Sequence, residues 1–329
     1  MLSMETKMNI FKYGKTWFVG PVLTFSVLSP IPANAAYPAR PITIVVPFGT
    51  GSGSDIQARF IANVMAQELK ATVLVENRPG ANAMIGAEYV AKAAPDGYTL
   101  LFGSGTANAA NYSMYPKNIK YSPDSFATIA LISKSPVLLF APTSSKYGDI
   151  RNVLSTAAKN PAGLSCGSGN TITQVACDTL KTKTNVFNVP YKGNSQSVTD
   201  LAGGQINIAF SDMIAASALV HASKITPLAI AASDRLDVLP DVPTFEEQGL
   251  KGFNFISWGA LFAPAGTPTE IVLKLNSTAR KAIASDDWET QRKRDGALKV
   301  TEDLNLSKKW VDDEIIRWKQ YIQTMGSEG

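Results

Sequence analysis

Residues 42–55 read ITIVVPFGTGSGSD, and this stretch decides the fold that we predict for the chain. Its first five residues are all β-branched, which is typical of a buried strand, and the rest form a turn rich in glycine and hydroxyl side chains. We expect a helix to follow, with Ser54 as its N-cap and Gln57 as the capping-box partner. Glycines let a ligand approach the backbone, and the start of a helix favours negative charge. The stretch therefore predicts an anion-binding loop.

A cleavable secretory signal is predicted at the N-terminus. Three lysines precede the apolar run 17–28, which is too short to span a bilayer comfortably, and Ala33-Asn34-Ala35 offers a small-x-small cleavage site. The helix-breaking Pro21 argues against an uncleaved anchor. We expect residues 1–35 to be the signal peptide and the mature protein to function outside the cytoplasm.

The charge balance of the chain identifies no charged partner. The formal charge is +4, and it falls to +2 without residues 1–35 because that segment carries three Lys and one Glu. Lys and Arg are interspersed with Asp and Glu, whereas nucleic-acid binders usually carry a basic stripe, so we expect no nucleic-acid partner. The apolar content of 45% is enough for one large core or two modest ones, and the length favours two domains.

Strands alternate with helices, and small polar loops follow the strands. After the first block, Asp149 is expected to cap a helix that reaches about Lys159, and the strand 164–166 runs into a second glycine and hydroxyl loop. A later strand, 206–210, ends at Ser211-Asp212. This pattern predicts parallel sheets that bind ligands at the carboxyl ends of their strands, and the two blocks predict two α/β lobes.

Two cysteines, Cys166 and Cys177, are present. The first is expected at the end of a strand and the second inside the next helix. In an oxidising compartment they can form a disulfide, and the alternative is a pair of buried thiols. The sequence leaves both interpretations open.

Cofactor binding and catalysis find little support. Glycines 49, 51 and 53 are spaced G-x-G-x-G, whereas the dinucleotide fingerprint is G-x-G-x-x-G. No G-x-S-x-G motif occurs, and the single histidine, His221, lies in an apolar segment without a catalytic context. One His and two Cys cannot build a usual zinc site unaided. We therefore expect no enzyme activity, no cofactor and no metal.

Ordered sequence blocks resemble the substrate-binding proteins of tripartite tricarboxylate transporters, called the Bug family, over nearly the whole mature chain. The blocks include residues 45–55, VENRPGA at 75–81, APDGYTLL at 94–101, VPYKG at 189–193, LPDVPT at 239–244, SWG at 257–259 and APAGTP at 263–268.

The resemblance implies an α/β, two-lobed periplasmic binding protein of the type II fold, with a ligand cleft between the lobes. The first lobe would hold residues 36–140 and 255–329, and the second would hold residues 141–254. Such a receptor would be a monomer that captures a small organic acid by cleft closure and delivers it to transmembrane transporter subunits. A sensor subunit that presents ligand to a signalling partner and a scaffold with weak hydrolase activity stay open as alternatives.

The resemblance also implies a ligand site formed by the polar loops of both lobes. The predicted ligand-binding residues are Phe48, Gly49, Thr50, Gly51, Ser52, Gly53, Ser54, Ser104, Thr106, Asn108, Ser168, Asn170, Thr171, Thr173, Tyr191, Ser195 and Asp212. We expect Asp55 to brace the first loop through backbone hydrogen bonds rather than to contact an anion.

Two positions depart from the family pattern. Gln174 stands where many members have histidine, and Ser211-Asp212 stands where many have Asp-Asn, so the carboxylate is shifted by one position. Asp212 is predicted either to meet an ammonium or hydroxyl group of the ligand or to cap the next helix. The identity of the ligand is left open by these differences.

Overall fold

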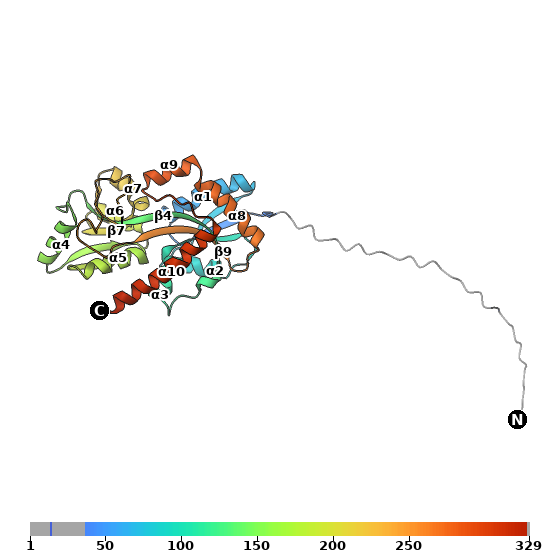
Figure 1. The fold of residues 1–329 in the computed structure, drawn as a ribbon, viewed down its shortest axis with the longest axis horizontal. Helices are drawn as coiled ribbons and strands as arrows, with labels where there is room; N and C mark the ends of the chain where they lie inside the picture. The colour runs from blue at the N-terminus through green and yellow to red at the C-terminus, as the bar shows by residue number, and fades with distance from the viewer. Residues whose placement is uncertain (1–13, 15–36, 328–329) are drawn as a thin grey trace, which may run out of the picture. The chain divides into compact units, whose positions relative to one another are not determined.

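The computed structural model describes residue 14 and residues 37–327. The predicted signal peptide, apart from Gly14, and its cleavage after Ala35 lie outside the described residues. Residues 36–329 form one compact unit, and the helices and strands of that unit are shown in Figure 1.

A curled sheet of nine strands forms the centre of the unit. Its strand order is β2-β1-β3-β9-β4-β7-β5-β6, and β8 also pairs with β4. The strands are β1 (Ile42–Val46), β2 (Val73–Asn77), β3 (Thr99–Ser104), β4 (Phe126–Pro142), β5 (Leu164–Ser168), β6 (Val186–Pro190), β7 (Ile208–Asp212), β8 (Ile225–Ala231) and β9 (Ile256–Pro264).

Helices cover both faces of this sheet. They are α1 (Gly53–Leu69), α2 (Met84–Ala91), α3 (Asn111–Met114), α4 (Ile150–Lys159), α5 (Thr171–Lys181), α6 (Asn194–Ala202), α7 (Met213–His221), α8 (Thr269–Ile283), α9 (Asp286–Arg294) and α10 (Leu304–Ser327). A π-helical turn, η1 (Thr106–Ala110), and a 3-10 turn, η2 (Pro123–Ser125), complete the regular structure.

The prediction of parallel strands is correct at both ends of the sheet and wrong at its centre. β1 pairs in parallel with β2 and β3, and β5 pairs in parallel with β6 and β7. The long strand β4 instead pairs antiparallel with β9 through residues 126–136, with β7 through residues 137–140 and with β8 through residues 137–142. One strand thus belongs to both halves of the sheet.

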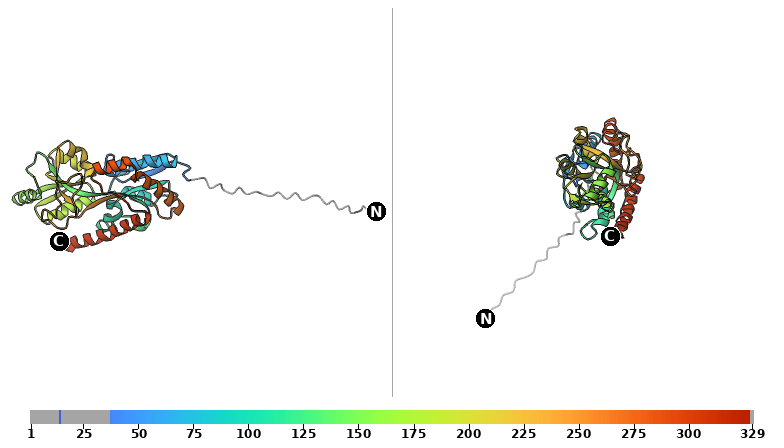
Figure 2. Two further views of the ribbon diagram at one scale, coloured as in Figure 1. Left: turned by 45° about the horizontal axis from the view of Figure 1, so that its top comes forward. Right: turned by 90° about the vertical axis from the view of Figure 1, so that its left-hand side faces the viewer.

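The two predicted α/β lobes are confirmed. The first lobe contains β1 to β3 with α1, α2 and α8, and the second contains β5 to β8 with α4 to α7, in each case with the connecting loops. Figure 1 and the left view of Figure 2 show the second lobe on the left and the first lobe on the right, with β4 and β9 running between them. The predicted lobe boundaries at 140/141 and 254/255 stay predictions.

A disulfide joins β5 to α5 in the second lobe. Cys166 and Cys177 are bonded, and their Cα atoms are 6.0 Å apart. Of the two interpretations that the sequence left open, the structure has the bridge. Because it ties the strand to the helix that follows it, it fixes the loop between them, which lies at the cavity described below.

The last helix, α10, packs on the core. Val311 and Trp318 are buried in the main hydrophobic cluster, and Ile315 and Ile322 pack against it. Within residues 37–327, none of the helices has the length and apolar character needed to cross a bilayer.

Candidate ligand-binding site

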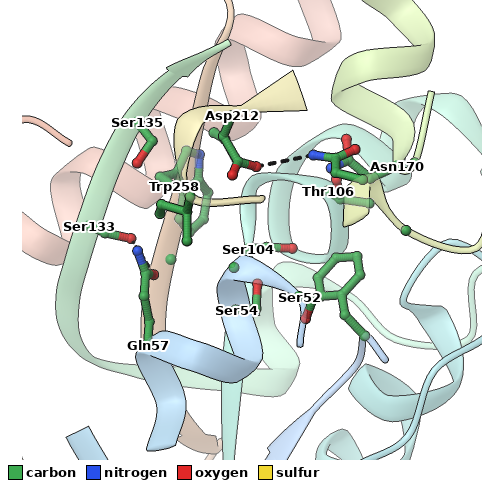
Figure 3. Close-up of a pocket in the computed structure, with 18 residues that line it drawn as sticks. Ser52, Ser54, Gln57, Ser104, Thr106, Ser133, Ser135, Asn170, Asp212 and Trp258 are labelled. Atoms are coloured by element: carbon green, nitrogen blue, oxygen red, sulfur yellow. Dashed lines mark hydrogen bonds between the residues drawn. The ribbon is translucent and has the colours of Figure 1, made fainter. Parts of the chain in front are cut away.

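A small cavity lies between the two lobes, near the carboxyl ends of β1, β3, β5 and β7 (Figure 3). The first lobe and the η1 turn line it with Phe48, Ser52, Gly53, Ser54, Gln57, Ser104 and Thr106. The second lobe lines it with Gly169, Asn170, Gly193, Asn194, Asp212 and Ile214, and β4 and β9 add Ser133, Ser135, Ser257, Trp258 and Gly259. The volume of the cavity is about 50 Å³, which is room for a small solute rather than a polymer.

The first-lobe loop places the start of α1 at the cavity. The predicted cap at Ser54 is wrong: the helix begins at Gly53, and Ser52 is the N-cap, with its Oγ accepting from Asp55 N over 3.2 Å. The turn brings Ser52 into this position because Gly51 has a φ of +78°, which glycine adopts without strain. Gln57 is therefore not a capping-box partner but faces the cavity.

Two backbone donors at the start of α1 are free. An α-helix leaves its first N–H groups without intrahelical acceptors. In the described part of the chain, Asp55 N has the Ser52 cap, whereas no acceptor contacts the N–H of Gly53 or Ser54. Both residues line the cavity. These N–H groups can therefore donate to a ligand oxygen at the positive end of the helix dipole.

Three more helices begin at the same cavity. The N-cap residues of α5, α6 and α7 are Asn170, Gly193 and Asp212, and all three line the cavity together with Ser52, the N-cap of α1. The starts of four helices therefore converge on one small space. Since each helix N-terminus carries a partial positive charge, this arrangement favours an anion, although no Lys, Arg or His among residues 37–327 lines the cavity.

Asp55 braces the first loop, as predicted. Its carboxylate accepts from Gly51 N over 2.9 Å and from Asn77 Nδ2 over 2.9 Å, and it is paired with Arg59. Burial alone would raise the pKa of Asp55, but the hydrogen bonds from Arg59, Gly51 and Asn77 hold this pKa below its ordinary value. The side chain is therefore charged at neutral pH and holds the loop rather than facing the cavity.

The strand β4 forms a polar wall of the cavity. Ser133 Oγ donates to Gln57 Oε1 over 2.7 Å, which links the wall to α1. Ser135, two residues further along the same strand, is 3% exposed, and its Oγ has no hydrogen-bond partner. Successive side chains of a strand alternate between its faces, so both serines lie on the cavity side. Ser135 thus offers an unused hydroxyl to a ligand.

Asp212 is the single charged side chain among the cavity-lining residues. Its Oδ1 accepts from Ala215 N over 3.0 Å, and its Oδ2 accepts from Asn194 Nδ2 over 3.1 Å. The capping role predicted for Asp212 is confirmed. The residue is 8% exposed, and burial raises the pKa of its carboxyl. Contact with a ligand stays a prediction.

Direct contacts join the lobes around the cavity. Ser195 Oγ donates to the carbonyl oxygen of Gly51 over 3.0 Å, and Thr171 Oγ1 donates to Asn111 Oδ1 over 2.7 Å. Gly53 also approaches α7 so closely that an added Cβ would lie 3.1 Å from Ile214 Cγ2. The structure is therefore that of a closed cleft.

The structure brings eight of the predicted ligand-binding residues together at the cavity. They are Phe48, Ser52, Gly53, Ser54, Ser104, Thr106, Asn170 and Asp212. The other nine lie outside the lining: Gly49, Thr50, Gly51, Asn108, Ser168, Thr171, Thr173, Tyr191 and Ser195.

Several of these nine residues support the loops that carry the lining. Ser168 Oγ donates to Asn188 Oδ1, Asn108 Oδ1 accepts from Ser104 N, and Thr173 Oγ1 accepts from the N–H groups of Gly169 and Asn170. Their direct contact with ligand stays a prediction.

Ten lining residues were not predicted from the sequence. They are Gln57, Ser133, Ser135, Gly169, Gly193, Asn194, Ile214, Ser257, Trp258 and Gly259. A usable signal existed for Ser133 and Ser135, because these two serines, with Lys134 between them, interrupt a mostly apolar segment and lie on one face of a strand. Gly193 and Asn194 lie between the predicted residues Tyr191 and Ser195. A prediction that covered the whole loop would have included them.

The titratable groups offer no metal centre in the part of the chain that the structure describes, because no group of three or more His, Cys, Asp or Glu side chains could hold an ion there. His221 lies at the exposed end of α7, where its Nδ1 contacts the carbonyl oxygen of Ser217 at 2.7 Å. It is absent from the cavity lining.

Comparison with known proteins agrees with this architecture. BugT of Bordetella pertussis is 30% identical over 313 residues, covering 93% of this chain and 95% of BugT. MatC from Rhodopseudomonas palustris, solved with bound malate, is 33% identical with a TM-score of 0.82, covering 87% of this chain and 100% of MatC. A second R. palustris protein, solved with adipate, is 32% identical with a TM-score of 0.84, covering 88% of this chain and 98% of its own.

A family match extends over most of the described sequence. Residues 57–327 match the tripartite tricarboxylate transporter family receptor. The similarity to BugT and to the two solved structures agrees with this match. The chain therefore belongs to the receptor family of the tripartite tricarboxylate transporters, the Bug family, and has the two-lobed type II fold of periplasmic binding proteins.

Proposed function

We propose that the protein captures a small organic carboxylate by closing its two lobes and delivers it to the membrane subunits of a tripartite tricarboxylate-type transporter. The observation that carries this proposal is the convergence of four helix N-termini on one cavity, with the N–H groups of Gly53 and Ser54 free to donate. Such donors hold a carboxylate without a basic side chain.

Closure is the physical basis of capture. The first lobe presents the α1 donors, and the second lobe adds the starts of α5, α6 and α7 only when the cleft is shut. A ligand that contacts both lobes binds the closed form more tightly than the open form, and it shifts the population by that difference in affinity. The hydrogen bond from Ser195 to Gly51 belongs to the closed form and adds to its stability.

The solved relatives support a carboxylate as the ligand, because one was solved with malate and another with adipate. The size of the cavity supports a short acid. Family and fold are those of receptors, so we propose binding without catalysis and without a cofactor. We also propose a monomer in the periplasm whose lobes comprise residues 36–140 with 255–329 and residues 141–254.

Native mass spectrometry of the purified protein tests the proposal. We expect a retained acid, or a bound acid after incubation with a mixture of short mono-, di- and tricarboxylates and aromatic acids. Binding of neutral or cationic solutes alone would refute the carboxylate proposal.

Delivery needs a separate test because binding alone does not distinguish a transport receptor from a sensor. Expression with the small transmembrane subunits of a tripartite transporter, followed by purification in the presence of the bound acid, should recover a complex. Acid binding together with retention of a signalling partner, and not of the transporter subunits, would contradict the delivery step.

A further inference from the structure

We propose that Asp212 selects the ligand, so that the bound acid carries a hydrogen-bond donor, a hydroxyl or an ammonium group, close to its carboxylate. This inference rests on the proposed function and narrows it to a ligand class. It makes Asp212 a specificity-determining residue as well as a helix cap.

The charge distribution in the cavity is the first reason. Of the 18 lining residues, Asp212 alone carries a charged side chain, and the others are apolar or offer hydroxyl, amide or indole groups. A ligand with only carboxylate groups would bring its negative charge next to the Asp212 carboxyl and would disfavour the ionised form of that carboxyl. Two carboxylates in one site repel each other unless a proton lies between them.

The position of Asp212 is the second reason. A Cβ added at Gly53 would lie 3.5 Å from Asp212 Oδ1, so this oxygen is next to the start of α1. The free N–H of Gly53 is the donor expected to hold the ligand carboxylate. A group attached beside that carboxylate is therefore within reach of Asp212.

Asp212 has capacity for another hydrogen bond. Each of its oxygens has one side-chain or backbone donor outside its own residue, from Ala215 N and from Asn194 Nδ2. An ionised carboxylate has about four acceptor positions and cannot donate. The unused positions can accept from a ligand hydroxyl or ammonium group but not from a bare carboxylate.

Ser135 is an independent sign that the cavity recognises a second polar group. Its Oγ is buried and unpartnered, and the residue lines the same cavity from β4. A buried hydroxyl without a partner is costly, and a ligand group that bonds to it removes that cost. A ligand whose single polar group is one carboxylate would leave the Ser135 hydroxyl without a partner.

Matched ligands test the inference. We would measure dissociation constants by isothermal titration calorimetry for propionate, lactate and alanine, and for succinate, malate and aspartate. In at least one set, the wild type should bind the hydroxy or the amino acid on the order of tenfold or more tightly than the unsubstituted acid, as expected for a hydrogen bond to a charged group. Comparison of the hydroxy acid with the amino acid in each set shows whether a hydroxyl or an ammonium group donates to Asp212.

Asp212→Asn is the informative variant because asparagine also caps helices well. In this variant, the dissociation constants of the hydroxy or amino acid and of the unsubstituted acid should differ by less than about threefold. Asp149→Asn is the matched control: Asp149 caps α4 through Asn152 N at 2.8 Å and is not part of the cavity, so its variant should keep the wild-type preference. If Asp212→Asn does not fold, Asp212→Ser, which also retains a capping side chain, replaces it.

Two outcomes would overturn the inference while leaving the proposed function in place. One is that the wild type binds acids but prefers the unsubstituted acids or shows no preference. The other is that Asp212→Asn keeps the wild-type preference. If the wild type binds none of the acids, including those retained in native mass spectrometry, the proposed function fails with it.

Discussion

Ser195 Oγ donates a hydrogen bond of 3.0 Å to the carbonyl oxygen of Gly51, and this contact links the first turn of α6 in the second lobe to the anion-binding loop of the first. The two residues are 144 positions apart in the sequence. Their contact exists because the cleft is closed. Neither residue lines the cavity, so changing this contact tests closure separately from ligand contacts.

Ser195→Ala removes this contact without changing the cavity lining. Loss of one hydrogen bond should weaken ligand binding by roughly two- to tenfold, about 0.5–1.5 kcal/mol, because only the closed form loses it. Calorimetric titration with the acid identified by native mass spectrometry measures the effect. Ser155→Ala is the control, since Ser155 Oγ donates to Asn152 O within α4, away from the cavity and from the contacts between the lobes. Equal affinities for the wild type and Ser195→Ala would show that the contact does not contribute to closure.

Gly53→Ala should disfavour closure in a different way. The added methyl would meet Ile214 Cγ2 at 3.1 Å, which is a contact between the lobes. We expect binding to weaken by about 1 kcal/mol, roughly fivefold, while the thermal stability of the ligand-free protein is maintained. Gly49→Ala is the matched control in the same loop, because nothing lies within 4 Å of its added methyl. Equal losses of affinity in both variants would contradict the steric explanation.

Asp55 should make stability depend on pH. Because its pKa is lowered in the folded protein, its contribution is present above the pKa of the unfolded chain, about 3.9, and is lost as the pH falls through the lower folded value. Asp55→Asn should therefore lower the free energy of unfolding at pH 7 by about 1–2 kcal/mol, with a smaller difference in acid.

Urea unfolding of the wild type and the variant from pH 7 to pH 3 measures this difference. The exposed Asp312 of α10 supplies the control substitution, Asp312→Asn, which should change little at any of these pH values. A difference between the wild type and Asp55→Asn that grows as the pH falls would contradict the assigned role of Asp55.

The disulfide between Cys166 and Cys177 should stabilise the second lobe. It closes a loop with a sequence separation of 11 residues, for which the chain-entropy estimate is about 2–3 kcal/mol. Replacing both cysteines by alanine should lower the free energy of unfolding by about that amount in urea titrations. A reducing agent should destabilise the wild type and leave the double variant unchanged. An equal response of both proteins to the reductant would rule out a role for the bridge.

Local signals in the sequence predicted the parts of the fold that depend on neighbouring residues. The helix capped by Asp149 ends at Lys159 as predicted, and the strand Ile42–Val46 has the predicted bounds. These predictions succeed because capping and β-branched runs act within a few residues. The strands β4 and β9 were missed because their pairing joins segments more than 100 positions apart and their sequences are apolar without regular alternation.

The site shows the same limit. The loops after β1 and β3 were predicted because each follows a strand directly, whereas Ser133 and Trp258 reach the cavity from the two long antiparallel strands. The cap of α1 was predicted two residues late because Ser52 and Ser54 are equally suitable by type, and the backbone turn at Gly51 decides between them.

The most direct test of the central claim is thermal unfolding with short carboxylic acids and with their uncharged amide counterparts, the acids and amides matched in size. If free backbone donors at the helix N-termini hold an anion in the closed cleft, at least one acid should raise the melting temperature, and its amide should not. A melting temperature that rises with an amide or a cationic solute, and with none of the acids, would contradict the account.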